Sequence, residues 1–135
     1  MRQIARPGIE SAHQRMQAST WDVGESLHLS LLEKDSLLTA LVVETTCHNV
    51  RVSLDPSEIP PIDATASGLC VLSFGLPYLL DPLAQEEHTR YTNTTLTDPT
   101  EIKELVATVS QTGWANSNGS YENGVYGYAA PNIWI

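Results

Sequence analysis

The chain has 135 residues, of which 41% are hydrophobic, and its 7 basic and 16 acidic side chains give a net charge of −9. A chain of this length buries roughly two thirds of its unfolded surface, so one domain can form without a disulfide or a metal. The acidic balance argues against a protein that binds a nucleic-acid backbone by itself, because phosphate contacts need lysine and arginine.

The first expected element is a helix over residues 3–18. Its apolar side would carry Ile4, Ile9 and Met16, although Pro7-Gly8 interrupts the early part. Arginines gathered near this end of the chain are interpreted as a solvated helix face.

Three strands are expected next. Ser26–Leu31 alternates leucine with polar residues, which is typical of a half-buried strand, and it places His28 on the polar side. Glu33–Asp35 supplies a polar turn, after which Leu37–Val43 is rich in aliphatic and β-branched residues and predicts a second strand. Alternation over Val50–Leu54 predicts a third.

Prolines then interrupt the sheet pattern, at Asp55-Pro56 and Pro60-Pro61. The run Ala64–Phe74 predicts a buried helix that ends at Gly75. Pro77–Glu87 predicts a short helix or turn on the surface.

The clearest helix signal lies later in the chain. Asp98 suits the N-cap, Pro99 suits the first helical position, and Gly113 is placed to end the helix. The residues of its apolar stripe are Ile102, Leu105, Val106 and Val109.

The last part of the chain predicts turns and strands. Asn118-Gly119 and Asn123-Gly124 favour tight turns with positive φ within a polar loop, and Tyr126–Ala130 predicts a strand. Residues 133–135 begin a further element. The order of elements differs from βαβ alternation and predicts an α+β domain, with a largely antiparallel sheet and helices packed against it.

Enzyme chemistry finds little support in the sequence. Ser73 lacks the glycine two residues earlier that a nucleophile elbow needs. His13 and His88 are interpreted as surface positions, and HExxH and glycine-rich phosphate motifs are absent. A distant enzyme hypothesis would rest on Cys47 and His48.

The cysteines and the chain's first residues indicate its compartment. Cys47 and Cys70 form neither a CxxC pair nor a zinc pattern with any histidine, and Cys70 lies among aliphatic residues expected in the core. The start of the chain shows no secretory signal, and no apolar run is long enough to span a membrane. We expect a reduced, cytoplasmic protein with no cofactor, no metal and no membrane contact.

A binding site is suggested by the helix start at Ala64–Gly68. Its small side chains would let a carboxylate approach the unsatisfied backbone N–H groups. The alternative is that these small residues merely let the helix pack closely on the sheet.

Several segments resemble one bacterial family, the IclR-type transcriptional regulators. Pro61–Gly68 is similar to a helix start that reads Pro-Leu-His-Ala-Thr-Ala-x-Gly-Lys in the family's effector-binding domain. The other similar segments, in the same order as in the family, are Gly24–Leu29, Thr92–Pro99, Gly113–Ala115 and Gly124–Pro131.

The resemblance implies a GAF-like or profilin-like domain that binds a small organic effector, either a carboxylic or an aromatic compound. Residues 1–19 would be a linker-type helix, and residues 20–135 an effector-binding domain that is incomplete at its C-terminus. The domain would form a homodimer or homotetramer and make no direct nucleic-acid contact, because DNA binding would reside in an absent winged helix-turn-helix.

Position by position, the resemblance also implies an effector site. The ligand would meet the backbone at Ala66 and Ser67, with Val125 as an apolar wall. Ser117 and Gly127 occupy two further pocket positions, where some relatives have Asp and Cys.

Other positions depart from the family pattern. Asp63 replaces the usual histidine and could cap the helix, and Leu69 replaces the usual lysine. Both changes reduce positive charge near the site, so the acidity of the effector stays open. Tyr126 and Tyr128 would point to the side opposite Gly127, by strand alternation. These departures leave an alternative function, a structural or oligomerisation module that has lost ligand sensing.

Overall fold

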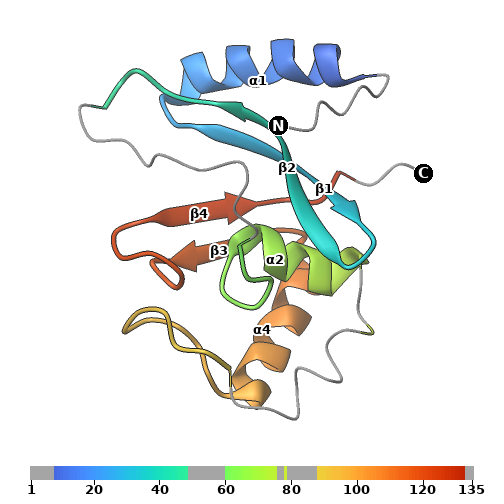
Figure 1. The fold of residues 1–135 in the computed structure, drawn as a ribbon, viewed down its shortest axis with the longest axis vertical. Coiled ribbons are helices and arrows are strands. Elements are labelled where there is room, and N and C mark those ends of the chain that lie inside the picture. The colour runs from blue at the N-terminus through green and yellow to red at the C-terminus, as the bar shows by residue number, and fades with distance from the viewer. Residues whose placement is uncertain (1–7, 49–59, 76–77, 79–87, 133–135) are drawn as a thin grey trace. The chain divides into compact units, whose positions relative to one another are not determined.

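The structure is a computed structural model that describes residues 8–48, 60–75, 78 and 88–132 (Figure 1). The chain divides into two compact units, Met1–Ile59 and Pro60–Ile135, which are described separately. The third strand predicted at 50–54, the last element predicted at 133–135 and almost all of the predicted 77–87 segment lie outside the described residues.

The first unit opens with a helix, α1 (Ile9–Val23). The helix predicted over residues 3–18 is therefore observed from Ile9 onward, but its predicted end was too early. The helix ends at Gly24, which takes a left-handed φ of 78° and donates its N–H to the Thr20 carbonyl, 2.8 Å away. Trp21 and Val23 in the final turn are 85% and 66% exposed, so they do not continue the apolar side that could have marked this end.

Two antiparallel strands follow, β1 (Leu27–Glu33) and β2 (Ser36–Val43). Leu27 lies opposite Val43 at one end of the ladder, and a two-residue turn with Lys34 at a φ of 55° closes the other end. Both predicted strands are confirmed, and β1 extends two residues further than its alternating pattern.

The second unit begins with α2 (Ala66–Cys70), which continues directly as a π-helix, η1 (Val71–Gly75). The predicted helix Ala64–Phe74 is confirmed in position, but it starts two residues later, and its second half is a π-helix instead of an α-helix. The hydroxyl of Ser73 donates to the Leu69 carbonyl at 2.7 Å within this segment. Back-bonding of this kind is associated with bent helices.

The next helix, α4 (Pro99–Thr112), confirms its predicted ends. The carboxylate of Asp98 accepts a hydrogen bond of 2.8 Å from the Thr100 N–H, and Gly113 ends the helix with a φ of 85°. The predicted apolar stripe is buried or half-buried at all four positions: Ile102, Leu105, Val106 and Val109.

The described chain closes with a hairpin of β3 (Ala115–Asn118) and β4 (Tyr126–Ala129). The second strand was predicted, but β3 was wrongly expected to be a polar loop. Asparagine and serine have low strand propensity, so pairing with β4 and burial of Ala115 decide the conformation. Gly119 and Gly124 take φ values of 70° and 77°, which confirms the two predicted positive-φ turns.

The core of the second unit lies where α2 and η1 pack against α4, β3 and β4 (Figure 1). Its members are small and aliphatic: Ala66, Leu69, Cys70, Leu72, Ile102, Val106, Val109 and Ala115. Cys70 is in the core as predicted, and its thiol donates to the Ala129 carbonyl at 3.3 Å. Burial raises the pKa of the Cys70 thiol, against a smaller opposing effect of a hydrogen bond with the Ala115 backbone, so this thiol stays protonated. The mixed α+β class with antiparallel pairing is confirmed in the described residues.

Candidate functional site

The start of α2 is held by the side chain of Thr65. Its hydroxyl accepts the N–H of Gly68 at 3.1 Å and donates to the Pro61 carbonyl at 2.8 Å. Thr65 is therefore the N-cap, in the extended conformation usual for that position. This cap ties the segment before the helix to the helix's first turn.

Gly68 lets that segment pass directly over the helix. A Cβ placed on Gly68 would lie 2.3 Å from both the Cα and the carbonyl oxygen of Ile62, which is closer than any side chain tolerates. The glycine therefore fixes how near the loop and the helix start approach each other. The small residues here were expected to let the helix pack on the sheet, but at Gly68 the close approach is to the loop that precedes the helix.

Asp63 does not cap the helix, contrary to expectation. Its carboxylate lies 2.6 Å from Nδ1 of His88, and an ionised carboxylate can only accept a hydrogen bond, so Nδ1 donates. His88 was predicted at the surface but is only 9% exposed. The partner lies 25 residues away, so no local pattern could have revealed this pair.

Three of the five predicted effector-binding residues come together at the junction of α2 with the hairpin. Ser117 and Gly127 are directly paired across β3 and β4. A Cβ on Gly127 would lie 3.2 Å from Oγ of Ser117 and 3.7 Å from Cβ of Ala66. Ala66 is buried, whereas Ser117 and Gly127 are half-buried.

The remaining two predicted residues adjoin this cluster along the chain. Ser67 follows Ala66 in α2, and Val125 precedes β4; both are half-buried. Val125 also closes the hairpin loop, because its carbonyl accepts the Gly119 N–H at 2.9 Å. We call Ala66, Ser67, Ser117, Val125 and Gly127 the junction site.

The other face of the hairpin carries exposed aromatic side chains. Tyr126 and Tyr128 are 71% and 76% exposed and alternate with the half-buried Gly127, which confirms the predicted alternation. The rings of Tyr128 and Trp114 lie 6.1 Å apart. A shallow hollow of about 300 Å³ adjoins these two rings and lies outside the junction site.

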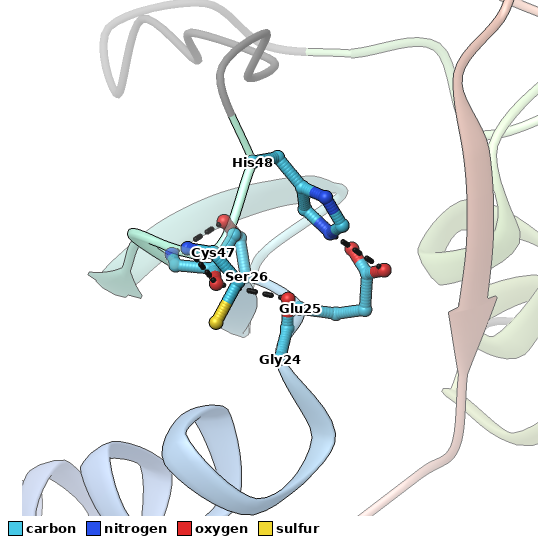
Figure 2. Close-up of polar contacts among 6 residues, drawn as sticks. Gly24, Glu25, Ser26, Cys47 and His48 are labelled. Atoms are coloured by element: carbon cyan, nitrogen blue, oxygen red, sulfur yellow. Dashed lines mark hydrogen bonds and ion pairs between the residues drawn. The ribbon is translucent and has the colours of Figure 1, made fainter.

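The candidate thiol of the distant enzyme hypothesis lies in the first unit. The Cys47 N–H donates to the Thr45 hydroxyl at 3.1 Å, and that hydroxyl donates to the Gly24 carbonyl at 2.9 Å. The ring of His48 lies 3.0 Å from the carboxylate of Glu25, and Figure 2 shows the Cys47 sulfur pointing away from this ring. These contacts tie the turn after β2 to the start of β1, and they do not arrange an activated thiol.

Within the described ranges, no three His, Cys, Asp or Glu side chains gather closely enough to hold a metal ion. None of the helices that the structure describes is long and apolar enough to cross a membrane.

Comparison with known proteins identifies the kind of domain. The sequence matches a family model described as "Bacterial transcriptional regulator IclR C-terminal" over residues 6–133. Comparison with curated protein sequences finds no match.

Solved structures of IclR regulators share the fold. The chain is 31% identical to one from Silicibacter sp. TM1040, with a TM-score of 0.84, covering 93% of this chain and 49% of that one. An IclR homolog from Microbacterium hydrocarbonoxydans, complexed with 4-hydroxybenzoate, is 25% identical with a TM-score of 0.78, covering 90% of this chain and 50% of that one. The Thermotoga maritima IclR shares the fold at 23% identity and a TM-score of 0.81, covering 94% and 51%. The chain spans about half the length of these proteins.

Proposed function

Because this chain belongs to the family of bacterial IclR C-terminal domains, we propose that it senses a small-molecule effector and oligomerises, while a separate winged helix-turn-helix binds DNA. The matched family and its solved neighbours are transcriptional regulators and not enzymes.

The observation that carries the proposal is the junction of Ala66, Ser117 and Gly127. A helix start and a strand pair meet there, and the absence of a side chain at Gly127 lets Ser117 and Ala66 approach this point closely. The effector would contact the backbone at Ala66 and Ser67, the hydroxyl of Ser117 and the apolar side of Val125. Small-molecule sites of this kind combine apolar walls with a few placed polar groups.

The proposed effector is a small aromatic or carboxylic compound. The relative crystallised with 4-hydroxybenzoate supports this class. The negative charge of Asp63 would oppose an acid, but this carboxylate accepts a hydrogen bond from His88 at 2.6 Å. That hydrogen bond disperses part of the carboxylate's charge, which weakens its repulsion of an aromatic acid without removing it.

The proposed mechanism is a shift between two arrangements of the subunits. An effector can move such an equilibrium only through a difference in its affinity for the two states. In this proposal, the domain is a homodimer or homotetramer in the cytoplasm, its fold is GAF-like, and residues 1–19 are a linker to the DNA-binding part. This chain itself makes no nucleic-acid contact.

A thermal-shift series with 4-hydroxybenzoate and related aromatic and aliphatic acids tests the proposal. Saturation at about 100 times Kd would stabilise the folded state by about 2.7 kcal/mol, which raises Tm by several degrees. Ser67→Trp should abolish this shift, because the indole would fill the junction site. Tyr126→Ala, on the opposite face of β4, is the matched control and should keep the shift. If no compound raises Tm, or if Ser67→Trp leaves the shift intact, the site is assigned wrongly.

The exposed aromatic face of the hairpin favours one alternative function, an oligomerisation module without sensing. Trp114, Tyr126 and Tyr128 are all exposed, and aromatic residues are enriched at protein interfaces. A stable oligomer in size-exclusion chromatography that is disrupted by Tyr128→Ser, together with no ligand response, would favour this alternative.

A further inference from the structure

Three threonines between His88 and α4 bond to consecutive carbonyls of the hairpin loop. Oγ1 of Thr94 donates to the Asn118 carbonyl at 2.8 Å. The hydroxyls of Thr92 and Thr95 donate to the next two carbonyls, each at 2.6 Å: Gly119 and Ser120. A ladder of three side-chain bonds thus joins one turn to another across more than twenty residues of sequence.

The hydroxyls are oriented by the turn that carries them. Oγ1 of Thr95 accepts the N–H groups of Tyr91 and Thr92 at 3.1 and 2.8 Å, and Oγ1 of Thr92 accepts the Thr94 N–H at 3.2 Å. Because these hydroxyl oxygens accept from the backbone of their own turn, their protons are directed outward to the loop carbonyls. Thr92 and Thr95 are buried, so each bond is shielded from competing water.

The same segment also contacts the start of α2. His88 begins it and bonds to Asp63 at 2.6 Å, three residues before Ala66. The His88 N–H also donates to the Thr97 carbonyl at 3.2 Å, which closes the segment on itself. Residues 88–97 therefore hold the helix start at one end and the hairpin loop at the other.

We propose that residues 88–97, the threonine clamp, are a positioning element that sets the distance between Ala66 and the paired Ser117 and Gly127. This inference rests on the proposed effector site and identifies what determines the size of ligand it accepts. The hairpin needs such support, because β3 consists of poor strand formers and an isolated two-stranded hairpin is only marginally stable.

Removal of a clamp hydroxyl by an isosteric change tests the proposal in the ligand-free protein. Thr92→Val should speed hydrogen exchange at the Gly119 and Val125 amides about tenfold, since a net hydrogen bond contributes on that scale. The matched control is Thr108→Val, which also removes a hydroxyl-to-carbonyl bond, to Glu104 at 3.1 Å, but within α4. It should leave the two hairpin amides unchanged. Equal exchange at these amides in Thr92→Val and Thr108→Val would overturn the clamp.

Should Thr92→Val fail to fold, Thr94→Val provides the same measurement at an exposed position. A purely structural role would lower global stability without loosening the hairpin selectively. The exchange rates are therefore compared with those of the α4 amides in the same sample. If the hairpin amides and the α4 amides exchange faster by the same factor, the variant has lost global stability, and the clamp is contradicted.

Ligand selectivity provides the second measurement. In the clamp variants, the ratio of Kd for 4-hydroxybenzoate to Kd for a larger naphthoic acid should rise at least threefold, because a hairpin that separates more easily from Ala66 admits the larger ring. An unchanged ratio alongside weaker binding of both compounds would overturn the inference. If neither acid binds the unaltered protein, the proposed function fails with these probes, while hydrogen exchange still decides whether the clamp exists.

Discussion

Ser117 and Gly127 face each other across the β3–β4 ladder, and a methyl group on Gly127 would lie 3.2 Å from the Ser117 hydroxyl. The same methyl would lie 3.7 Å from Cβ of Ala66, so it would occupy the point where strand pair and helix meet. A serine hydroxyl can rotate away from such a methyl. The glycine therefore avoids crowding where the strand pair meets the helix, at a point where the only close neighbour of a methyl group could move aside.

Gly127→Ala should weaken ligand binding strongly while lowering the free energy of unfolding only slightly. We expect a loss of stability below about 1.5 kcal/mol, as for modest overpacking that a side chain can relieve. Binding of the acid that raises Tm most should weaken at least tenfold, because the added methyl lies inside the proposed site. Isothermal titration calorimetry and urea unfolding measure the two quantities.

The control for this change lies on the other face of the same strand. Tyr128→Ala alters an exposed side chain and should leave Kd within twofold of the unaltered protein. Unchanged affinity in Gly127→Ala would remove Gly127 from the site.

Gly68→Ala, in contrast, should lower the free energy of unfolding by a large amount. The new methyl would lie 2.3 Å from backbone atoms of Ile62, which cannot move aside as a flexible side chain can. Overpacking against backbone places the cost at about 3 kcal/mol or more. Gly113→Ala is the control, since its site is open and only its φ of 85° opposes a side chain, at about 1 to 2 kcal/mol. Similar urea midpoints for the two variants would contradict the steric explanation.

The sequence predicts α4 well because each of its signals is local. Asp98, Pro99 and Gly113 act within one turn of the residues that they cap, and the apolar stripe follows the helical period. β3 was missed because nothing within Ala115–Asn118 favours a strand. Its conformation comes from pairing with β4 and from burial of Ala115 under α2.

In the candidate site, too, some residues are placed by local sequence and others by contacts between distant segments. Small residues at the helix start could be read from the sequence, and alternation placed Gly127 opposite the tyrosines. The close approach of Gly127 to Ala66 depends on tertiary packing, which no local pattern encodes. The hydrogen bond between Asp63 and His88 likewise joins two segments that are 25 residues apart in the sequence. Asp63 and Thr65 are both favoured N-cap residue types, and the cap is at Thr65 because its hydroxyl accepts the Gly68 N–H.

His28 should make the stability of the first unit sensitive to acid. His28 is exposed on β1, yet partial desolvation of its ring lowers its pKa below the ordinary value of 6.5, while the carboxylate of Glu44 acts in the opposite direction. The unfolded chain then binds a proton more readily than the folded one, so stability is retained above pH 6.5 and falls as the pH drops below it. His28→Gln should reduce the loss of Tm between pH 7.5 and 5.5.

A second variant checks the cause of this pH dependence. Glu44→Gln removes the group that raises the pKa of His28, so acidification should lower Tm more than in the unaltered protein. Identical Tm profiles against pH for His28→Gln and the unaltered chain would show that another group is responsible.

Thr65 should be the side chain on which the helix start most depends. Thr65→Val removes both the bond from the Gly68 N–H and the bond to the Pro61 carbonyl, while it keeps the shape of the residue. Loss of a helix cap costs about 1 to 2 kcal/mol, measured by urea unfolding. Thr65→Ser keeps the hydroxyl and should recover most of that loss. If Thr65→Ser unfolds as early as Thr65→Val, packing of the methyl group, and not capping, holds the helix start in place.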